Sequence, residues 1–579
     1  MKKLFYGFIA CGVLLSAFFH KSVSNKMEDW LNHATSIVQA KAVDAELEEF
    51  KNFFKTTRAV PNDINIGAFW AGMTAKQDGN FEESLFYLRK AYHADPEDPK
   101  LAKDLYLLEG VYGNVDKLLD FYTGDTNNDS QFFFSRYIKI AQAVKEQNYE
   151  RAKTILHTDK DKIEDLYERP LLAWVYAGLK DKKAALDILS KMGKDEFSTH
   201  LRMYHTAMIL DYLGDTQEAE KYYAKIADIS GIASWTTLVS GREFFERQKK
   251  WSINNRFLLK YTKVLDESPL LHDVIEQVGM PAIKTPAEGI SELFYSWGIN
   301  ASERYELAAF IVNVSLYLND KHNLAKIWLA ESLERLGYYA TSHRIYSELW
   351  RDSNRSDIIL YKQGNLYLKE KNYSEALRVF NDLLSRNRNN FMLNSLIANS
   401  HKEMGNCKEA LPFYNKTISL LEKMGISNMQ DIYFETGVCY LKENKFSEFE
   451  KNMRACLMLN SEDASVLNYL AYAWLERDMH IDEATLFLEK AHKLQPDAPE
   501  IMDSLALAYY KKQRYADALV LAEKAVDLMG ASSVANMHLG DIYKALGRER
   551  EALSQYEKAL ALKYDLTPEV EKELLERLK

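Results

Sequence analysis

The polar residues that could take part in chemistry are dispersed along this 579-residue chain. Asp125, Asn127 and Asp129 begin like a calcium-binding loop, which places oxygen ligands at alternate positions. Such a loop also needs a glycine and a bidentate glutamate, but Ser130 and Arg136 stand at those two positions. We therefore interpret the stretch as an ordinary polar loop.

Motifs for catalysis are missing from the sequence. It contains no phosphate-binding glycine loop, no nucleophile elbow and no HExxH zinc motif, and its 13 histidines are scattered. Pairs of acidic residues carry no enzymatic signal, because 84 Asp and Glu residues produce such pairs by chance. We therefore predict that the chain is not an enzyme and that it holds no cofactor and no metal.

The cysteines form no metal-binding pattern. Apart from Cys11, in the apolar N-terminal stretch, the chain has Cys407, Cys439 and Cys456. An odd number cannot be fully paired within one chain, and the spacings match no zinc site. The favoured interpretation is three small side chains on helices.

A repeat of about 34 residues organises most of the chain. When LGDIYKALGREREALSQYEKAL (539–560) is compared with the upstream sequence, an anchor position recurs, usually as alanine. Most steps between anchors are 33–35 residues, and steps of 39 after Ala410 and 54 after Asn254 are interpreted as insertions. The anchors are Ser84, Leu118, Ala152, Ala185, Ala219, Asn254, Ala308, Ser342, Ala376, Ala410, Phe449, Ala484, Ala518 and Ala552.

Other positions recur in phase with the anchor. Small residues suited to close helix contact come twelve residues before it: Gly72, Ala173, Ala207, Ala330, Gly364, Ala398, Gly437, Ala506 and Gly540. Glycines that can end a helix in a left-handed turn come five residues before it: Gly79, Gly113, Gly214, Gly337, Gly405 and Gly547. This period and this order are the signature of tetratricopeptide helix pairs.

The predicted fold class is all-α: a right-handed α-solenoid of about 14 tetratricopeptide-like helix-turn-helix units with a C-terminal capping helix. We divide the chain into an N-terminal helix and linker (25–64), an N-terminal lobe (65–265), a proline-containing insertion (266–285), a C-terminal lobe (286–565) and the capping helix (566–579). The cap is predicted from Thr567 as N-cap, from Pro568 and from the apolar residues Val570, Leu574, Leu575 and Leu578.

Residues 1–24 are predicted to be a signal peptide or a membrane anchor. MKK precedes the apolar run Leu4–Phe19, which at 16 residues is shorter than the roughly 20 of a spanning helix. Ser22 and Ser24 fit a cleavage site, and an uncleaved anchor or lipidation at Cys11 are the alternatives. The predicted location is the periplasm, or the inner membrane with the chain facing the periplasm.

Candidate binding residues lie on the first helices of the pairs, which line the concave face of such an array. Glu331, Asn365 and Asn399 come eleven residues before their anchors in consecutive units, and their polar groups can bond to an extended peptide. The complete set is Glu331, Tyr361, Lys362, Asn365, Asn399, Tyr469, Asp503, Ser504, His538 and Asp541. The alternative for this set is a solvated surface or hydrogen bonding between neighbouring repeats.

Three segments near the C-terminus go beyond the general repeat. VLNYLAYAWLERDMHIDEA, EIMDSLALAYY and NMHLGDIYKALGREREA resemble a family of large exported tetratricopeptide proteins from alphaproteobacteria. TPAEGISELFYSWG, ERPLLAWVYAGL and YHTAMILDYLGD are similar to other segments of that family, and Ala471, Ala473 and Ala506 depart from its pattern. The resemblance implies an envelope-associated interaction protein, and it supplies no catalytic residues.

These observations predict a scaffold or adaptor for other proteins in the bacterial cell envelope, which binds peptides or helices in its concave groove. The net charge of −10 argues against a nucleic acid partner. Two alternatives stay open: an envelope polymer (glycan) binding or processing factor, and a cytoplasmic co-chaperone-type adaptor.

Overall fold

The computed structural model describes residues 66–121, 134–157, 166–227, 235–250, 256–259, 283–301, 304–352, 356–562, 566 and 568–578. The predicted signal or anchor (1–24), the N-terminal helix and linker (25–64), Asp125 to Asp129, Thr567 and most of the insertion at 266–285 lie outside these residues. The chain forms two compact units, Met1–Glu370 and Lys371–Lys579. All secondary structure in the described stretches is helical.

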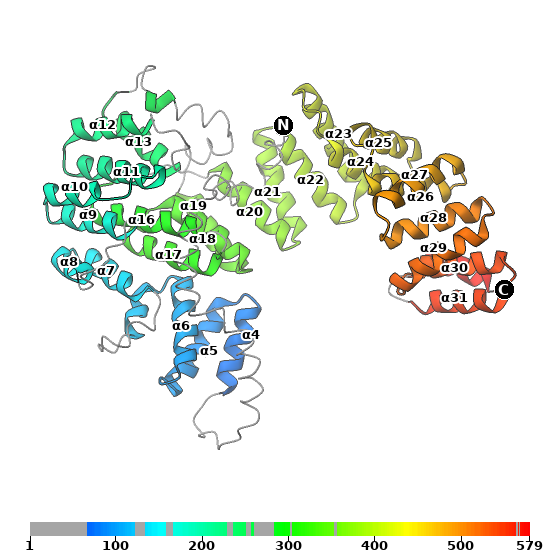
Figure 1. Ribbon diagram of the computed structural model, residues 1–579, viewed down its shortest axis with the longest axis horizontal. Coiled ribbons are helices and arrows are strands. Elements are labelled where there is room, and N and C mark those ends of the chain that lie inside the picture. The colour runs from blue at the N-terminus through cyan, green and yellow to red at the C-terminus, as the bar shows by residue number, and fades with distance from the viewer. Residues whose placement is uncertain are drawn as a thin grey trace. The chain divides into compact units, whose positions relative to one another are not determined.

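The first unit consists of antiparallel helix pairs (Figure 1). Its helices are α4 (Ile66–Gln77), α5 (Phe81–Ala94), α6 (Pro99–Tyr112), the 3-10 helix η2 (Val115–Phe121), α7 (Ser135–Lys145), α8 (Tyr149–His157), α9 (Glu168–Gly178), α10 (Lys182–Ser190), α11 (Glu196–Tyr212), α12 (Thr216–Ala227), α13 (Trp235–Arg247), α16 (Pro286–Asn300), α17 (Tyr305–Leu318), α18 (Asn323–Arg335), α19 (Tyr339–Asp352) and α20 (Asp357–Lys369).

The second unit continues with the same construction (Figure 1). Its helices are α21 (Tyr373–Arg386), α22 (Phe391–Glu403), α23 (Cys407–Lys423), α24 (Gln430–Lys442), α25 (Phe446–Leu459), α26 (Ala464–Leu475), α27 (Ile481–Leu494), α28 (Pro499–Lys511), α29 (Tyr515–Leu528), α30 (Ser533–Ala545), α31 (Glu549–Ala561) and α32 (Pro568–Arg577). From α22 to α31, each first helix packs against the helix that follows it.

The anchors are the contact points within the helix pairs. Where an anchor is serine, its hydroxyl donates to the small residue twelve positions earlier: Ser84 Oγ is 2.8 Å from the Gly72 carbonyl oxygen and Ser342 Oγ is 2.9 Å from that of Ala330. Every anchor except Asn254, which is outside the described residues, is at most 1% exposed. The prediction of an all-α tetratricopeptide array is confirmed.

The turn between the two helices of a pair requires a left-handed backbone. All six glycines predicted for this turn have φ between 74° and 99°. In six units without the glycine, the residue five before the anchor adopts the same region: Gln147, Lys180, Lys249, Lys371, Asn444 and Gln513 have φ between 52° and 62°. The packing of the two helices therefore sets this turn, even where the residue type opposes it.

In the first unit, helices that follow the insertion pack on helices that precede it. α17 packs on α6 as well as on α18, and α16 packs on α7 and α9. Asn313 Nδ2 donates to the carbonyl oxygens of Gly110 and Val111 at 3.0 and 2.7 Å. Helices on both sides of the insertion therefore share one core within the first unit, which ends at Glu370.

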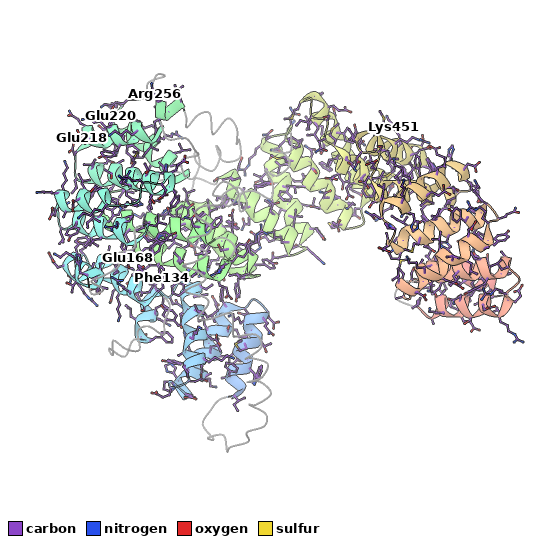
Figure 2. The ribbon with its side chains drawn as sticks, in the orientation of Figure 1. Phe134, Glu168, Glu218, Glu220, Arg256 and Lys451 are labelled. Carbon is purple, nitrogen blue, oxygen red and sulfur yellow. A yellow bond between two sulfur atoms is a disulfide. The ribbon has the colours of Figure 1, made fainter. Side chains whose placement is uncertain are left out.

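An aromatic cluster strengthens this packing. Figure 2 labels Phe134, at the start of α7. Its ring centroid lies 5.6–6.0 Å from those of Phe294, Trp297 and Phe310 in α16 and α17. Burying rings in edge contacts of this kind stabilises a fold beyond the area that they bury. The sequence period carries no signal for these contacts, because they join residues far apart in the chain.

The C-terminal cap is present as α32, which packs on α30 and α31. Leu574 is fully buried, and Val570 and Leu578 pack against the same core. Leu575, expected on the apolar side, is instead 46% exposed, since Leu574 and Leu578 already fill the side that faces the array.

Cys407 and Cys439 lie on helices, as expected, but they are more than small side chains: they form a disulfide, with Cα atoms 4.9 Å apart. Their separation of 32 residues is close to one repeat, which brings the start of α23 against α24. Cys456 is a free cysteine and is buried. Within the described ranges, no helix is both long and apolar enough to span a bilayer.

Candidate protein-binding surface

Two of the predicted residues in the first unit form an ion pair. Lys362 on α20 pairs with Glu331 on α18, and their side chains are 11% and 19% exposed. The pair joins successive first helices, so hydrogen bonding between neighbouring repeats accounts for both charges.

The two other candidates on α20 differ in their surroundings. Tyr361 is half-buried and packs against the hydrophobic core of the first unit. Asn365, one helical turn later, is also half-buried, and its amide forms no hydrogen bond with the described residues. Asn365 is therefore the candidate in this unit with hydrogen-bonding capacity for a partner.

In the second unit, Asn399 lies on α22. Its Oδ1 accepts a hydrogen bond from the Tyr414 hydroxyl at 2.6 Å, which orients the amide. The side chain stays half-buried, so its amide donors lie at the surface of the unit. Asn399 is therefore held in one orientation before any partner arrives.

Tyr469, on α26, belongs to an aromatic cluster. Its ring centroid is 5.5 Å from that of Phe434 on α24 and 6.0 Å from that of Phe449. Burial, with the charge of Glu435, raises the pKa of Tyr469, so the hydroxyl stays protonated at neutral pH. The rings offer an apolar contact with a hydrogen-bonding group at its edge.

Phe434 of this cluster and two charged residues, Lys402 and Glu435, were not predicted. Lys402 on α22 donates to Glu435 on α24 at 2.8 Å, and Phe434 lies next to Glu435. Glu435 comes fourteen residues before its anchor, Phe449, as the predicted residue Lys362 does before Ala376, so this spacing could have indicated it. We call the half-buried residues Asn399, Lys402, Phe434, Glu435 and Tyr469 the α22–α26 surface.

The last repeats hold the remaining candidates in buried contacts. His538 Nδ1 is 3.0 Å from Asp503 Oδ2, and both side chains are at most 10% exposed. Burial alone would lower the pKa of His538, but the charge and hydrogen bond of Asp503 raise it above its ordinary value. Ser504 is buried and donates to the Glu500 carbonyl oxygen of its own helix at 2.9 Å.

The carboxylate of Asp541 is paired with a residue of the C-terminal cap. Arg577 of α32 donates to both of its carboxylate oxygens, and the Tyr556 hydroxyl donates at 2.7 Å. Asp503, Ser504, His538 and Asp541 thus have partners inside the second unit. The two other candidates of that unit, Asn399 and Tyr469, are half-buried and belong to the α22–α26 surface.

A shallow hollow lies on the exposed side of α25, where Figure 2 labels Lys451. It is lined by Ser447, Glu450, Lys451, Arg454, Ala455 and Met458, all from one helix. None of the predicted residues contributes to it. Among the described residues, no group of three His, Cys, Asp or Glu side chains is placed to hold a metal ion.

Comparisons with known families find the repeat in both units. Models described as tetratricopeptide repeat match residues 68–98, 359–390, 500–529 and 534–565. The matched segments cover helix pairs at both ends of the array and in the middle of it.

Curated relatives match parts of the chain. The TPR repeat-containing protein PA4667 of Pseudomonas aeruginosa is 34% identical over 100 residues, 17% of this chain and 17% of that protein. Anaphase-promoting complex subunit 7 of Mus musculus is 27% identical over 192 residues, 33% of each chain. The BBSome complex member BBS4 of Bos taurus is 23% identical over 278 residues, 47% of this chain and 52% of that one. The chain thus spans between about a sixth and about half of the length of these relatives.

Among solved structures, a tetratricopeptide repeat protein from Parabacteroides merdae is 19% identical and covers 44% of this chain and 97% of its own, with a TM-score of 0.35. The Cut9–Hcn1 complex covers 90% of this chain and 97% of its own at 14% identity, with a TM-score of 0.34. The phased buried anchors, the left-handed turns and the four matched segments together identify the chain as a tetratricopeptide repeat protein.

Proposed function

We propose that this protein is a scaffold that holds protein partners in the bacterial cell envelope, and that it captures a peptide or a helix on the α22–α26 surface. The observations that carry the proposal are the half-buried ring of Tyr469 beside Phe434 and, on α22, the amide of Asn399 that the Tyr414 hydroxyl orients. Tetratricopeptide arrays expose extended concave surfaces that serve for binding.

The chemistry of the surface suits a polypeptide. Tyr469 and Phe434 contribute apolar area with few rotatable bonds, so little entropy is lost when a partner binds. The Asn399 amide can donate to a peptide carbonyl group. The Lys402–Glu435 pair lies across the same helices and can exchange its mutual contact for charges of a partner.

The relatives support a role in assemblies. Two of them carry the names of complexes in their own descriptions, the anaphase-promoting complex and the BBSome. A partner for the present chain is inferred from the shared repeat, and its identity is a matter for experiment.

An envelope location is supported by three features. The basic start and apolar run of residues 1–24 are typical of export, and the sequence resembles an exported family. The Cys407–Cys439 disulfide suits an oxidising compartment such as the periplasm, since disulfides are rare in the cytosol.

The binding proposal can be tested with matched variants of the full chain. We would combine Asn399→Ala with Tyr469→Ala and compare proteins recovered from envelope extracts by quantitative mass spectrometry. The control is Leu486→Ala, which removes a 65% exposed apolar side chain from α27. Loss of a defined partner in the double variant and its retention in the control support the proposal. Unchanged recovery in the double variant removes these residues from it.

The location can be tested separately. A reporter fused after residue 60 distinguishes export from retention in the cytoplasm, because a phosphatase reporter is active only outside it. Activity of a cytoplasm-specific reporter at the same position would contradict the envelope location and favour a cytoplasmic adaptor. The binding proposal would survive that result.

A further inference from the structure

In the first unit, helix α16 lies against the side of the array that first helices line. It packs on α7, α9 and α11, the first helices of three successive pairs (Figure 1). A Cβ at Gly289 would lie 2.3 Å from the Trp174 ring of α9, so the glycine allows this close approach. On α11, the Tyr204 hydroxyl donates to Glu292 Oε1 at 3.3 Å. The first unit thus holds a helix of its own on the side that tetratricopeptide arrays use for binding.

The contacts with α16 come from recurring positions. Tyr204 stands fifteen residues before its anchor, and Trp174 stands eleven residues before its own. Tyr137 of α7, also fifteen residues before its anchor, has its ring centroid 5.0 Å from that of the α16 tryptophan. In the α22–α26 surface, Tyr469 occupies the first of these positions and Asn399 the second. The surface therefore repeats positions that hold α16 in the first unit.

These positions are covered in the first unit and more open in the second. Leu171 and Trp174, fourteen and eleven residues before the anchor on α9, are completely buried. The same two positions on α24 are Glu435 and Val438, and both are half-buried. α9 packs on α16 as well as on α8, α10 and α11, whereas α24 packs mainly on α23 and α25. A helix in the place that corresponds to α16 would cover Glu435 and Val438.

On the basis of the binding function proposed above, we propose that the α22–α26 surface takes an α-helix of a partner protein, placed as α16 is placed in the first unit, with a glutamine or asparagine that accepts from the Tyr469 hydroxyl. Within the described residues this hydroxyl forms no hydrogen bond, so it can donate to a partner as Tyr204 donates to Glu292. A helix makes its own backbone hydrogen bonds, so the surface has to match only side chains.

The charges around Tyr469 favour an uncharged amide over a carboxylate at this place. The Lys402 ammonium is shared by two carboxylates, at 2.8 Å from Glu435 and 3.1 Å from Glu403, so one negative charge stays unbalanced. Burial and the charge of Glu435 both raise the pKa of Tyr469, which places this carboxylate within reach of the hydroxyl. A glutamate like Glu292 would be repelled here, whereas an amide oxygen accepts the same hydrogen bond without a charge.

A defined peptide tests the helix. The probe is a synthetic peptide of residues 286–300 with Glu292→Gln and a hydrocarbon staple between positions 287 and 291, on the side where the Ser291 hydroxyl meets α17 in the chain. Its comparison is the same peptide without the staple and with Ser291→Pro, which breaks a helix. Fluorescence anisotropy with the full chain should show about tenfold tighter binding of the stapled peptide. Equal binding of the two peptides, or no binding of either, would overturn the proposal.

A variant of the chain shows whether the peptide binds at the α22–α26 surface. Tyr469→Phe removes only the hydroxyl, so the stapled peptide should bind about fivefold more weakly. Tyr509→Phe is the matched control, because the Tyr509 hydroxyl donates to Glu489 on an exposed side of the second unit, and it should leave binding unchanged. Equal affinities of these two variants for the peptide would contradict the proposed site.

The preference for an amide has its own measurement. The unmodified chain should bind the Glu292→Gln peptide about tenfold more tightly than the stapled peptide that keeps Glu292, and this ratio should fall towards one in the Glu435→Gln chain. A preference for the glutamate peptide, or the same ratio in both chains, would overturn the assignment of an amide.

The peptide measurements can be separated from partner recovery out of envelope extracts. Loss of a partner in the double variant of Asn399 and Tyr469, without binding of the stapled peptide, would reject the helix and keep the binding function. Unchanged partner recovery in the double variant would count against the binding function itself.

Discussion

Arg577 holds Asp541 at two points, with Nε 2.8 Å from Oδ1 and Nη2 3.0 Å from Oδ2. The contact joins the last helix, α32, to α30, and it raises the pKa of Arg577 above its ordinary value through the hydrogen bond to Asp541. Two parallel charge-assisted bonds fix the relative orientation of both groups. Asp541, predicted as a partner-binding residue, therefore contributes to the attachment of the cap.

Replacing Arg577 by alanine should detach the cap. We expect a loss of about 1–3 kcal/mol in the free energy of unfolding of the second unit, because a half-buried carboxylate loses two charge-assisted bonds. Urea unfolding gives the free energy, and hydrogen exchange of residues 568–577 shows whether the loss is local. Lys512→Ala breaks the exposed pair with Asp482 and should change little. Equal effects in the two variants would contradict this role of Arg577.

The second unit should lose stability as the pH rises above neutrality. Burial lowers the pKa of His538, but Asp503, with smaller contributions from Glu476 and Asp541, raises it above the unfolded value of 6.5. The stabilisation is therefore complete below that value and is lost as the pH rises through the raised pKa. Tyr472 also faces the imidazole, with ring centroids 6.4 Å apart, and burial raises its pKa. In His538→Gln the decrease measured by urea unfolding between about pH 6 and about pH 9 should be smaller.

The first unit should respond to pH in the opposite direction. His205 is buried and accepts a hydrogen bond at Nδ1 from Trp174 Nε1 at 3.0 Å. Burial lowers the pKa of His205 from 6.5 to about 3, so acid protonates the unfolded chain first. Stability from this residue is lost as the pH falls below 6.5, by about 2 kcal/mol at about pH 5. His205→Gln should reduce the acid sensitivity of the first unit, whereas His538→Gln should leave it unchanged.

Much of this fold could be predicted because the repeat reports local packing. Each anchor contacts residues of its own helix pair, as Ser84 does with Gly72, so its position follows from spacing along the chain. No such spacing predicted the packing of α17 on α6 in the first unit. Gly110 permits it, since a Cβ there would lie 2.0 Å from the ring of Phe310. These residues are 200 positions apart, and Gly110 occupies none of the recurring small positions.

The binding residues were harder to predict than the fold. The spacing in the sequence predicts which residues lie on the concave side of the array. It does not predict which of them form hydrogen bonds or ion pairs with other residues of the same chain. Asp503 and His538 satisfy each other, and Asp541 is taken by Arg577 from the cap. Tyr469 and Asn399 remain as candidates because their packing leaves them half-buried at the surface.

Reduction of the Cys407–Cys439 disulfide should destabilise the second unit. Opening a link across 32 residues restores conformational freedom to the unfolded chain, with an expected loss of about 2–4 kcal/mol. Alkylation of the unfolded, unreduced protein followed by mass spectrometry should label Cys456 and leave the bonded pair unlabelled. Cys407→Ala with Cys439→Ala should reproduce the loss without reductant. Labelling of Cys407 before reduction would show that the bond is not formed.

The turn between α28 and α29 should be stabilised by glycine. Gln513 holds a left-handed backbone at φ 60°, which disfavours residues with a Cβ, whereas Gly547 occupies the same turn position between α30 and α31 at φ 74°. Gln513→Gly should raise the free energy of unfolding by about 0.5–1 kcal/mol, and Gly547→Gln should lower it by about 1 kcal/mol.

These two substitutions isolate the contribution of the backbone to the free energy of unfolding, because Gln513 is exposed and a Cβ at Gly547 would meet no atom within 4 Å. Urea unfolding of the second unit measures both variants on the same baseline. Changes of opposite sign would show that the helix pair imposes the turn on whichever residue stands there. A destabilised Gln513→Gly would mean that contacts of the glutamine side chain outweigh the backbone preference.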